Sequence, residues 1–556
     1  MTREPQTLRQ EPVAQMARVV IDAMEWQRVR MRLTGRFVDA AARSVLGSSP
    51  EFFLMETVTE RIVNLPGASC DGERFVIDDN MMRLDDLYPL EIGTWALFVR
   101  SSGSDVAPIP VGMADGMTLP ARHYGGAFTT HAYRYWLLPN ALSESGQFAL
   151  EVNYRKSPRA AKPTGIAGLS RDVRDLLRKF RAAVFKAVYA AARRLVRKNG
   201  HRILFTSDSR AGLSGNLECV HTRMIERGLD RDYRLMRQFK SSIVAKRPLL
   251  EKFSFPLKLA IADVIVLDDF HPMLYTVPFD PEVRIIQVWH ASGAFKTVGY
   301  SRVGKPGSPS PFSKSHKNYT HAIVSSDHDT RFYAEAYGLP EERIFATGIP
   351  RMDLFFDEEY KSRAIESVYT AMPRLRDSRV VLFVPTFRGS GPSDAYYDFD
   401  RLDLPALYSL CVEQDTVVVF KMHPFVRQTL RIPEAFADRF IDATTSREVN
   451  ELLLVADLVI TDYSSVVFEY STLKRPMLFF AYDLDEYIAS RDFYEEFADF
   501  VPGKIVETFS ALIDAMRTGD YEVEKVGLFA SKHLRYLDAG STDRVIDQLV
   551  LGRDAS

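Results

Sequence analysis

The sequence predicts a mixed α/β protein in which a small β-rich domain precedes two doubly wound domains that face a cleft. Short β-rich runs divided by Gly, Pro, Asp and Asn turns fill residues 49–156, a texture typical of an antiparallel sheet. From residue 201 onward, short apolar strands alternate with helical segments in two successive series, as in parallel sheets covered by helices. The chain has 556 residues, 46% of them hydrophobic, which is ample for several cores.

Charge and cysteine content exclude some classes of protein. The net charge of -2 gives no overall attraction to nucleic acid, so we expect no nucleic-acid partner. Cys70, Cys219 and Cys411 stand alone in the sequence, which argues against a disulfide framework or a cysteine zinc site and fits the cytoplasm. The polar N-terminus lacks the apolar core of a signal peptide, and no stretch of about 18 uncharged apolar residues occurs. We therefore expect any membrane contact to be peripheral.

Two segments flank the β-rich domain. Residues 1–48 join a polar leader to an apolar spacing that predicts a helix, through Val19, Met24, Val29 and Leu33. On the other side, a linker rich in Pro, Ala and Gly leads into a basic helix. The predicted divisions are the leader at 1–48, the β-rich domain at 49–156, the linker and basic amphipathic helix at 157–200, and the α/β domains at 201–340 and 341–556.

The basic helix, residues 171–198, contains ten Lys or Arg and only two Asp. An apolar stripe recurs there at steps of three or four residues, through Val173, Leu177, Phe180, Val184, Val188, Ala191 and Leu195. A helix this basic suits an anionic lipid surface. The expected membrane-binding cluster is Arg193, Arg194, Arg197 and Lys198. The alternative is a connecting helix whose stripe packs on the protein while its basic face is only solvated.

The two α/β series supply the strands that would position a ligand. The first contains predicted strands at residues 203–206, 233–237, 264–267, 285–289 and 322–325. The second begins near Ile344 and continues at 380–385, 417–421, 440–442, 458–461 and 477–480. Ligands of doubly wound sheets bind at the carboxyl ends of the strands, so the residues just past each strand are the candidates for chemistry.

Two histidines follow strands in this way. His290 comes directly after the strand at 285–289 and precedes a Gly-containing turn, and His423 follows the strand at 417–421 and precedes Pro424. An imidazole at such a position can act as a base near neutral pH. Each histidine alone is equally explained as a hydrogen-bonded partner in a turn. Because they lie at corresponding ends of two domains, we expect them to share a cleft.

The strand at 458–461 ends in Thr-Asp-Tyr-Ser-Ser, immediately before a helical segment. Backbone N–H groups at the start of a helix, its dipole and the hydroxyls of Ser464 and Ser465 suit a phosphate. An ordinary capped helix would explain the same residues.

Cationic and hydroxyl-bearing residues follow other strands of the second series. Arg351 ends the segment Thr-Gly-Ile-Pro-Arg, and Thr386 and Arg388 follow the strand at 380–385. The two arginines would supply forked donors to a diphosphate. Asp483 and Asp485 resemble a metal-binding Asp-x-Asp pair, but the arginines and the helix start already offer charge neutralisation, so we expect no metal.

These motifs together resemble those of the CDP-glycerol glycerophosphotransferase family, which makes teichoic acid and related polyol-phosphate polymers. The motifs, in chain order, are IIQVWHASGAFKTVGY, ATGIPRMD, VPTFRG, FKMHP and ITDYSSVVFEYSTLKRPMLFFAYD. The earlier segment SDSRAGLSGN is similar to the opening strand and loop of that family, and the resemblance covers about residues 202–544.

The resemblance implies a GT-B-like transferase with two Rossmann-like domains, in which the second binds the CDP donor and the first meets the acceptor. His290 would take the proton from an acceptor hydroxyl that attacks the β-phosphorus of CDP-glycerol and releases CMP. His423 would stabilise the diphosphate as charge moves onto the leaving group. The donor phosphates and ribose would be held by Arg351, Thr386, Arg388, Ser464, Ser465 and Glu469.

The chain departs from the family pattern at two places. Ala291-Ser292-Gly293 follows His290 where the family usually has Gly-Thr-Pro, and Glu469 replaces the more usual Asp. Both changes leave the polyol and the acceptor open.

The expected activity is transfer of glycerol phosphate, or a related polyol phosphate, from a CDP-polyol to a lipid-linked polyol-phosphate or glycan acceptor. It would take place at the cytoplasmic face of the plasma membrane, with no cofactor. The alternatives are a GT-B nucleotide-sugar glycosyltransferase or epimerase, and a non-catalytic membrane adaptor. The number of units added and the oligomeric state stay open.

Overall fold

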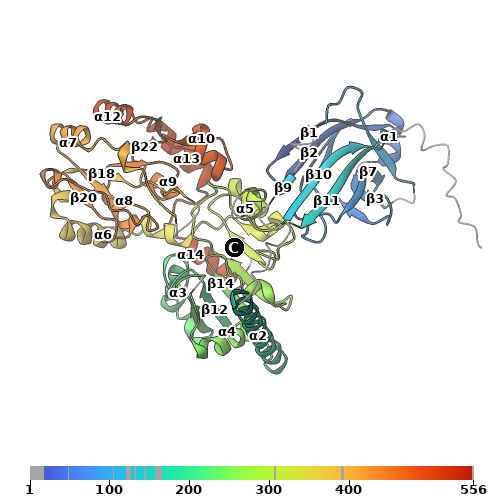
Figure 1. Cartoon of the computed structure of the whole chain (residues 1–556), viewed down its shortest axis with the longest axis horizontal. Helices are drawn as coiled ribbons and strands as arrows, with labels where there is room; N and C mark the ends of the chain where they lie inside the picture. The colour runs from blue at the N-terminus through green and yellow to red at the C-terminus, as the bar shows by residue number, and fades with distance from the viewer. Residues whose placement is uncertain are drawn as a thin grey trace, which may run out of the picture. The chain divides into compact units, whose positions relative to one another are not determined.

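The computed structural model describes residues 18–553, except for residues 48, 104–105, 120–126, 130–132, 143–145, 157–165, 244, 306–307 and 390–393. The polar leader up to residue 17 and residues 157–165 of the predicted linker, which was expected at 157–168, therefore lie outside the described residues. The chain divides into two compact units, coloured along its length in Figure 1. The first comprises Met1–Pro163, Val298–Ser313 and Glu335–Leu339, and the second comprises Thr164–Thr297, Lys314–Ala334 and Pro340–Ser556.

The first unit is built on an eleven-stranded sheet with the order β5-β6-β2-β1-β8-β7-β11-β10-β9, to which β3 and β4 add at β7. Its neighbouring strands pair antiparallel except for β1 and β8, which are parallel. Its elements are β1 (Val19–Gln27), β2 (Arg30–Phe37), α1 (Ala40–Leu46), β3 (Pro50–Glu56), β4 (Ile62–Asn64), β5 (Ala68–Asp71), β6 (Arg74–Asn80), β7 (Gly93–Ser101), β8 (Ile109–Met113), β9 (Ala127–Thr129), β10 (Tyr133–Ala141) and β11 (Phe148–Lys156).

The helix predicted before residue 48 is wrong, because most of that segment forms the hairpin β1–β2. Arg28 takes a φ of 54° and turns the chain between the two strands. In β2, Met31, Leu33 and Phe37 are buried on one face while Arg32 on the other face is exposed. This period of two is the pattern of a half-buried strand, which the wider apolar spacing had concealed.

The later segments of the first unit complete its core. Tyr300 and Val303 belong to its buried apolar cluster, and the ring of Phe312 meets Tyr135 edge-on at 5.5 Å between centroids. Glu335, only 1% exposed, pairs with Arg28 at 2.7 Å.

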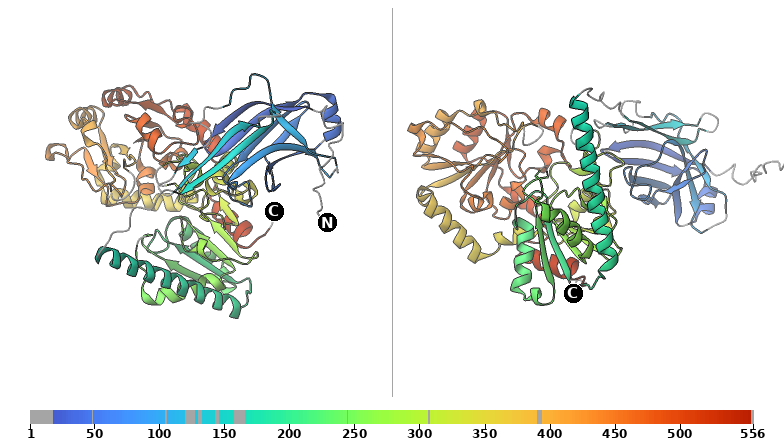
Figure 2. Two further views of the ribbon diagram at one scale, coloured as in Figure 1. Left: turned by 45° about the vertical axis from the view of Figure 1, so that its right-hand side comes forward. Right: turned by 60° about the horizontal axis from the view of Figure 1, so that its bottom comes forward.

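The second unit contains two parallel six-stranded sheets, which confirms the predicted pair of doubly wound layers (Figures 1 and 2). The first sheet has the order β13-β12-β14-β15-β16-β17, and the second has the order β20-β19-β18-β21-β22-β23. Both orders reverse direction once, at the kind of switch point where doubly wound sheets bind ligands.

The elements of the first sheet are β12 (Arg202–Ser207), α3 (Gly215–Glu226), β13 (Arg234–Phe239), α4 (Leu249–Ile261), β14 (Val264–Leu267), β15 (Arg284–Gln287), β16 (His321–Ile323), α5 (Asp327–Tyr337) and β17 (Ile344–Phe345). Those of the second are η6 (Pro350–Phe355), α6 (Glu358–Ala371), β18 (Arg379–Phe383), α7 (Leu404–Glu413), β19 (Thr416–Phe420), β20 (Phe440–Asp442), α8 (Val449–Val455), β21 (Leu458–Thr461), α9 (Val466–Ser471), β22 (Met477–Phe480), α10 (Leu484–Ser490), α11 (Phe497–Phe500), β23 (Lys504–Val506), α12 (Phe509–Thr518) and α13 (Glu524–His533).

The strand at Ile344 does not start the second series, contrary to the prediction. As β17 it pairs with β16, with Ala322 opposite Ile344, and it forms the edge of the first sheet. The end of the chain also returns to this sheet: α14 (Ser541–Arg544) and η10 (Val545–Val550) pack on α3 and β15 (Figure 1). Arg227 anchors η10 through a 2.7 Å ion pair with Asp547. Long-range pairing of this kind leaves no local signal in the sequence.

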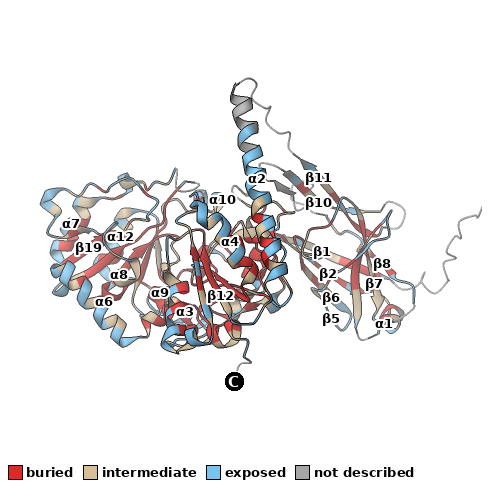
Figure 3. Cartoon of the chain, turned by 90° about the horizontal axis from the view of Figure 1, so that it is seen from below, coloured by how far each residue is buried: buried red, intermediate tan, exposed pale blue. Residues whose placement is uncertain are grey.

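The basic helix is present as α2 (Ile166–Leu195), which packs on α4 through its second half (Figure 3). Phe185, Tyr189 and Ala192 are buried, and the rings of Phe185 and Phe255 are 5.9 Å apart. The predicted apolar stripe is therefore not the packing face. Residues of its first half are exposed instead, with Phe180 at 65%. Among the described residues, no helix is long and apolar enough to cross a membrane.

Two members of the predicted membrane-binding cluster also contact the protein itself. Arg193 pairs with Asp280, and Lys198 donates to the carbonyls of Ala260 and Ala262 at the C-terminal end of α4. A cation at that end of a helix is favoured by its dipole. Arg194 and Arg197 are exposed, as the prediction requires.

Candidate active site

His290 lies in a strained turn just past β15. Trp289 before it takes a φ of 45°, a left-handed conformation that costs a bulky residue energy and persists only where neighbours hold it. Gln287 accepts the Trp289 N–H at 2.9 Å. Asn216, at the start of α3 and only 2% exposed, donates to the carbonyls of Val288 and Trp289, each at 2.8 Å. The turn that presents His290 is thus fixed by side chains from two elements.

Asp269, just past β14, faces the imidazole of His290, with 3.9 Å between Asp269 Oδ2 and His290 Nδ1. The His290 side chain is 45% exposed, so its other edge is open to a ligand. The partial loss of solvent lowers the pKa of His290 below its usual value; Asp269 opposes this change, and Arg351 reinforces it. The ring is therefore neutral near pH 7 and able to accept a proton.

Arg351 connects the His290 turn to the second sheet. Its backbone N–H donates to Asn216 Oδ1 at 3.0 Å. Its guanidinium donates to Ser292 Oγ at 3.2 Å and forms an ion pair with Glu469. One buried amide, Asn216, therefore positions both the His290 turn and Arg351, and sequence reasoning missed it. The only signal was its place in the loop SDSRAGLSGN.

Glu469 lies in α9 and is only 2% exposed. Its Oε1 atom accepts a hydrogen bond from Ser292 Oγ at 2.6 Å and forms an ion pair with Arg351. One of the two carboxylate oxygens expected to bind ribose is therefore already bonded to Ser292. Oε2 has no hydrogen-bond partner within the described part of the chain. The ribose role of Glu469 stays a prediction, and its observed partners join the two sheets.

His423 lies just past β19, half-buried between aromatic rings. Its ring centroid is 4.7 Å from that of Phe387 and 4.8 Å from that of Phe425. The Phe425 N–H donates to His423 Nδ1 at 3.2 Å, so the neutral ring carries its proton on Nε2. Burial lowers the pKa of His423 to about 4, with Lys296 and Arg491 adding to the effect. His423 is thus a neutral hydrogen-bond donor near pH 7.

Lys296 and Arg491 are two further cations at this end of the site, and sequence reasoning missed both. The Arg491 guanidinium lies 4.9 Å from the ring centroid of Phe387, the ring that also contacts His423. The backbone at Lys296 bridges to that at Phe493, which brings the segment following His290 beside the residues after α10. Lys296 stands in the motif that begins at residue 285, whereas nothing in the sequence marked Arg491.

Arg388 is not available to a diphosphate, which corrects its predicted role. The side chain is 7% exposed, and its guanidinium pairs with Asp462 at 2.8 Å and with Asp483. Four tyrosine rings surround it at 5.0 to 5.6 Å: Tyr397, Tyr463, Tyr482 and Tyr487. Arg388 therefore joins the ends of β18, β21 and β22 beneath the surface. The same pairing occupies Asp483, one of the two carboxylates of the Asp-x-Asp pair.

The remaining predicted residues lie along the same strand ends. Thr386 is 4% exposed, and its N–H donates to Asp462 at 2.7 Å. Ser464 and Ser465 are half-buried just before α9, and neither hydroxyl caps the helix at a normal distance. With six residues, α9 is shorter than the sequence indicated, so its dipole contributes less than expected. The hydroxyls remain the predicted phosphate contacts.

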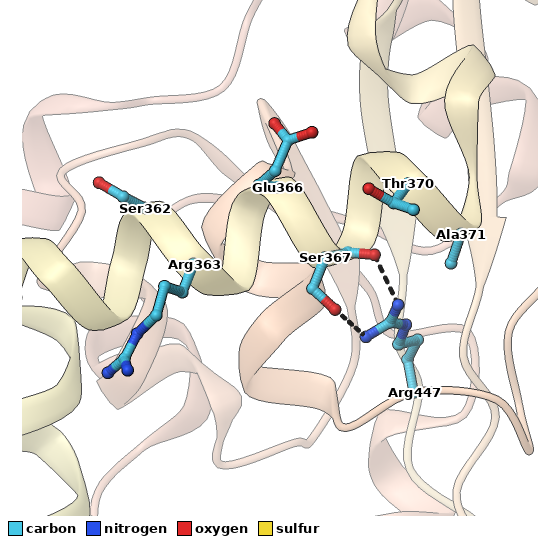
Figure 4. Close-up of a pocket in the computed structure, with 7 residues that line it drawn as sticks. All are labelled: Ser362, Arg363, Glu366, Ser367, Thr370, Ala371 and Arg447. Atoms are coloured by element: carbon cyan, nitrogen blue, oxygen red, sulfur yellow. Dashed lines mark hydrogen bonds between the residues drawn. The ribbon is translucent and has the colours of Figure 1, made fainter.

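Two other features of the second unit resemble binding sites. A shallow groove on α6, drawn in Figure 4, is bordered by Arg447, which donates to Ser367 O at 2.6 Å. None of the predicted site residues lines it. His328, Asp329 and His533 bring metal-binding atoms together, but His533 already contacts Asp329 at 3.4 Å, and Glu495 holds His328. We therefore assign no metal to this group.

Comparison with known proteins identifies the family of the chain. Residues 188–551 match the family model described as CDP-Glycerol:Poly(glycerophosphate) glycerophosphotransferase. The teichoic acid ribitol-phosphate polymerase TarL of Staphylococcus aureus (strain NCTC 8325 / PS 47) is 36% identical over 96% of this chain and 99% of its own. TarK of the same organism, also a teichoic acid ribitol-phosphate polymerase, is 44% identical over 75% of this chain and 81% of its own.

Solved structures support the fold. The wall teichoic acid polymerase TagF matches with a TM-score of 0.54 and 22% identity, over 68% of this chain and 97% of that one. The GT-B-like architecture predicted from the motif series is thus confirmed, together with the β-rich sheet before it. On the strength of the family model and these relatives, the chain belongs to the CDP-glycerol:poly(glycerophosphate) glycerophosphotransferase family.

Proposed function

We propose that the protein transfers a polyol phosphate from a CDP-polyol to a hydroxyl of a lipid-linked acceptor in teichoic acid synthesis, releasing CMP. The observation that carries the proposal is the pair of histidines, each just past a parallel strand, with different proton roles. His290 is neutral beside Asp269, and His423 presents its Nε2 proton. Family membership supports the same reaction.

In the proposed reaction the acceptor hydroxyl gives its proton to His290 and its oxygen attacks the β-phosphorus of the donor. The bond from that phosphorus to the bridging oxygen breaks, and CMP leaves with the electron pair. His423 donates a hydrogen bond to the diphosphate, and Lys296 and Arg491 offset the negative charge that develops there. Asp269 stabilises the imidazolium formed at His290, which fits its place beside the ring.

Ribitol phosphate is the first candidate for the transferred group. The two relatives with the highest coverage described above are named as ribitol-phosphate polymerases, whereas the family model is named for glycerol phosphate. A ligand that binds the folded protein raises its thermal midpoint. We expect CDP-ribitol to raise the midpoint more than CDP-glycerol, and UDP-N-acetylglucosamine to leave it unchanged. Equal stabilisation by the UDP-sugar would instead favour a nucleotide-sugar enzyme.

We further propose that α2 holds the protein on the anionic cytoplasmic face of the plasma membrane. Leu176 and Phe180 in its first half are 68% and 65% exposed, so this half offers apolar side chains that the protein does not cover. Exposed cations lie on the same helix, among them Lys179 and Arg194. Apolar side chains beside cations are what an interfacial helix requires. The lipid-linked acceptor would be met at that surface.

A further inference from the structure

A groove in the second unit runs between α2 and the loop at residues 276–278. Its helix side carries three cations, Lys186, Arg193 and Arg194, and its loop side is formed by the hydroxyl-bearing Thr276 and the apolar Val277 and Pro278. Tyr189 lies at its base. Apolar groups thus line one part of the groove, while cations gather along the helix.

The groove is held in shape by contacts at its base. Tyr189, 3% exposed, donates from its hydroxyl to the carbonyl of Pro278 at 2.6 Å. Its ring meets Phe279 edge-on with 5.9 Å between centroids. Because these contacts join the helix to the loop, the two sides keep a fixed separation.

Among the residues that the structure describes, one carboxylate pairs with the cations that line the groove. Asp280 pairs with Arg193 and fixes the position of that guanidinium. Lys186 and Arg194 are exposed. Three positive charges against one carboxylate leave two in excess, which suits a phosphate.

The groove also lies next to the part of α2 proposed to meet the membrane. Phe180, 65% exposed, precedes Lys186 by six residues, or about 9 Å along the helix axis. Residues 179, 186 and 193 repeat every seven positions and so share one face. An anion in the groove would therefore lie within about two helical turns of Phe180 along α2.

We propose that this groove binds the phosphate of an anionic phospholipid head group, and so sets how α2 rests on the membrane. The inference rests on the proposed membrane role of α2. The cations contact the phosphate oxygens, and the apolar loop side faces the glycerol and upper acyl region. A free phosphate shares the first set of contacts but not the second.

The test is flotation with vesicles of equal surface charge, made anionic either by phosphatidylglycerol or by oleate, a carboxylate. The full chain should prefer the phosphatidylglycerol vesicles by at least about threefold. The groove variant Lys186→Gln/Arg194→Gln should lose this preference. The control Lys179→Gln/Arg197→Gln removes the same charge from exposed positions outside the groove. It should bind both vesicles more weakly but keep the preference.

The outcomes separate the two proposals. Failure of the unaltered protein to bind either vesicle would overturn the membrane role of α2. Binding without a preference, or a preference kept by the groove variant, would overturn the groove alone. Inorganic phosphate that abolishes the preference at the same concentration as short-chain phosphatidylglycerol would assign the groove to free phosphate. Equal thermal midpoints of the two variants verify that both are folded.

Discussion

Replacing Asn216 tests how the site is held together. Its side chain makes three hydrogen bonds, to the carbonyls of Val288 and Trp289 and from the N–H of Arg351. Asn216→Ala leaves three buried backbone groups unpaired, and each costs about 1 kcal/mol or more. We therefore expect the free energy of unfolding to fall by about 3 kcal/mol.

The effect on activity should be larger than this loss of stability alone explains. The Trp289 turn no longer has its support, so His290 moves, and displacement of a reacting group by about 1 Å costs roughly 100-fold in rate. Asn216→Asp retains an acceptor for Arg351 but sets a carboxylate oxygen against the two carbonyls. We expect it to lower kcat while donor KM changes little, whereas the alanine variant changes both.

Urea unfolding measures the free energy of unfolding. The rate of CMP release at saturating and at limiting donor concentrations measures kcat and kcat/KM. Asn318→Ala is the control, because Asn318 is a partly buried amide of the second unit that donates to Leu274 O at 3.0 Å. It should cost about 1 kcal/mol and leave kcat/KM unchanged. An Asn216→Ala protein with full kcat/KM, or one that loses no more stability than the control, would refute the positioning role.

Other consequences follow from the same contacts. Arg388→Met leaves Asp462 and Asp483 buried without their cation, so it should lower the free energy of unfolding by about 3 to 5 kcal/mol. Urea unfolding measures this, and a loss below about 1 kcal/mol would contradict the ion-pair account. Burial lowers the pKa of His290, so the acid limb of kcat/KM should lie below the ordinary value of about 6.5 for histidine. Asp269→Asn removes a contact that opposes this lowering and should shift the limb to still lower pH, whereas an upward shift would contradict the pairing. Lys296→Gln/Arg491→Gln should raise the pKa of His423 above about 4, observable by NMR titration of its ring, and weaken donor binding. An unshifted titration would place the two cations elsewhere. Finally, Leu176→Ser/Phe180→Ser should reduce vesicle binding at both low and high salt, whereas Arg194→Gln/Arg197→Gln should reduce it mainly at low salt. Binding indifferent to all four changes would remove α2 from the membrane.

The sequence predicted those parts of the fold that have a local pattern. Strands at 264–267, 458–461 and 477–480 have their observed bounds, because each is a short apolar run with a clear break on either side. The pairing of Ile344 with the first sheet and the return of residues 541–550 depend on contacts between distant segments. Such contacts carry no periodicity, so the predicted boundary between the domains was misplaced.

Prediction of the site shows the same division. Position after a strand selected His290, His423 and Arg351 as candidates, because strand ends of a parallel sheet converge. The same criterion could not distinguish the accessible Arg351, which is 21% exposed, from the buried Arg388, which is 7% exposed. The burial of Arg388 depends on its ion pairs with Asp462 and Asp483, which follow other strands. Asn216 and Arg491 were missed because neither follows a strand directly.

Analysis of the reaction products by mass spectrometry tests the central claim most directly. The full chain would be incubated with a lipid-linked acceptor and CDP-ribitol or CDP-glycerol in parallel, beside His290→Gln. The account predicts an acceptor that gains polyol phosphate units and an equal amount of CMP, with no product from the variant although it still binds donor. Transfer of a sugar, or full turnover by His290→Gln, would contradict it.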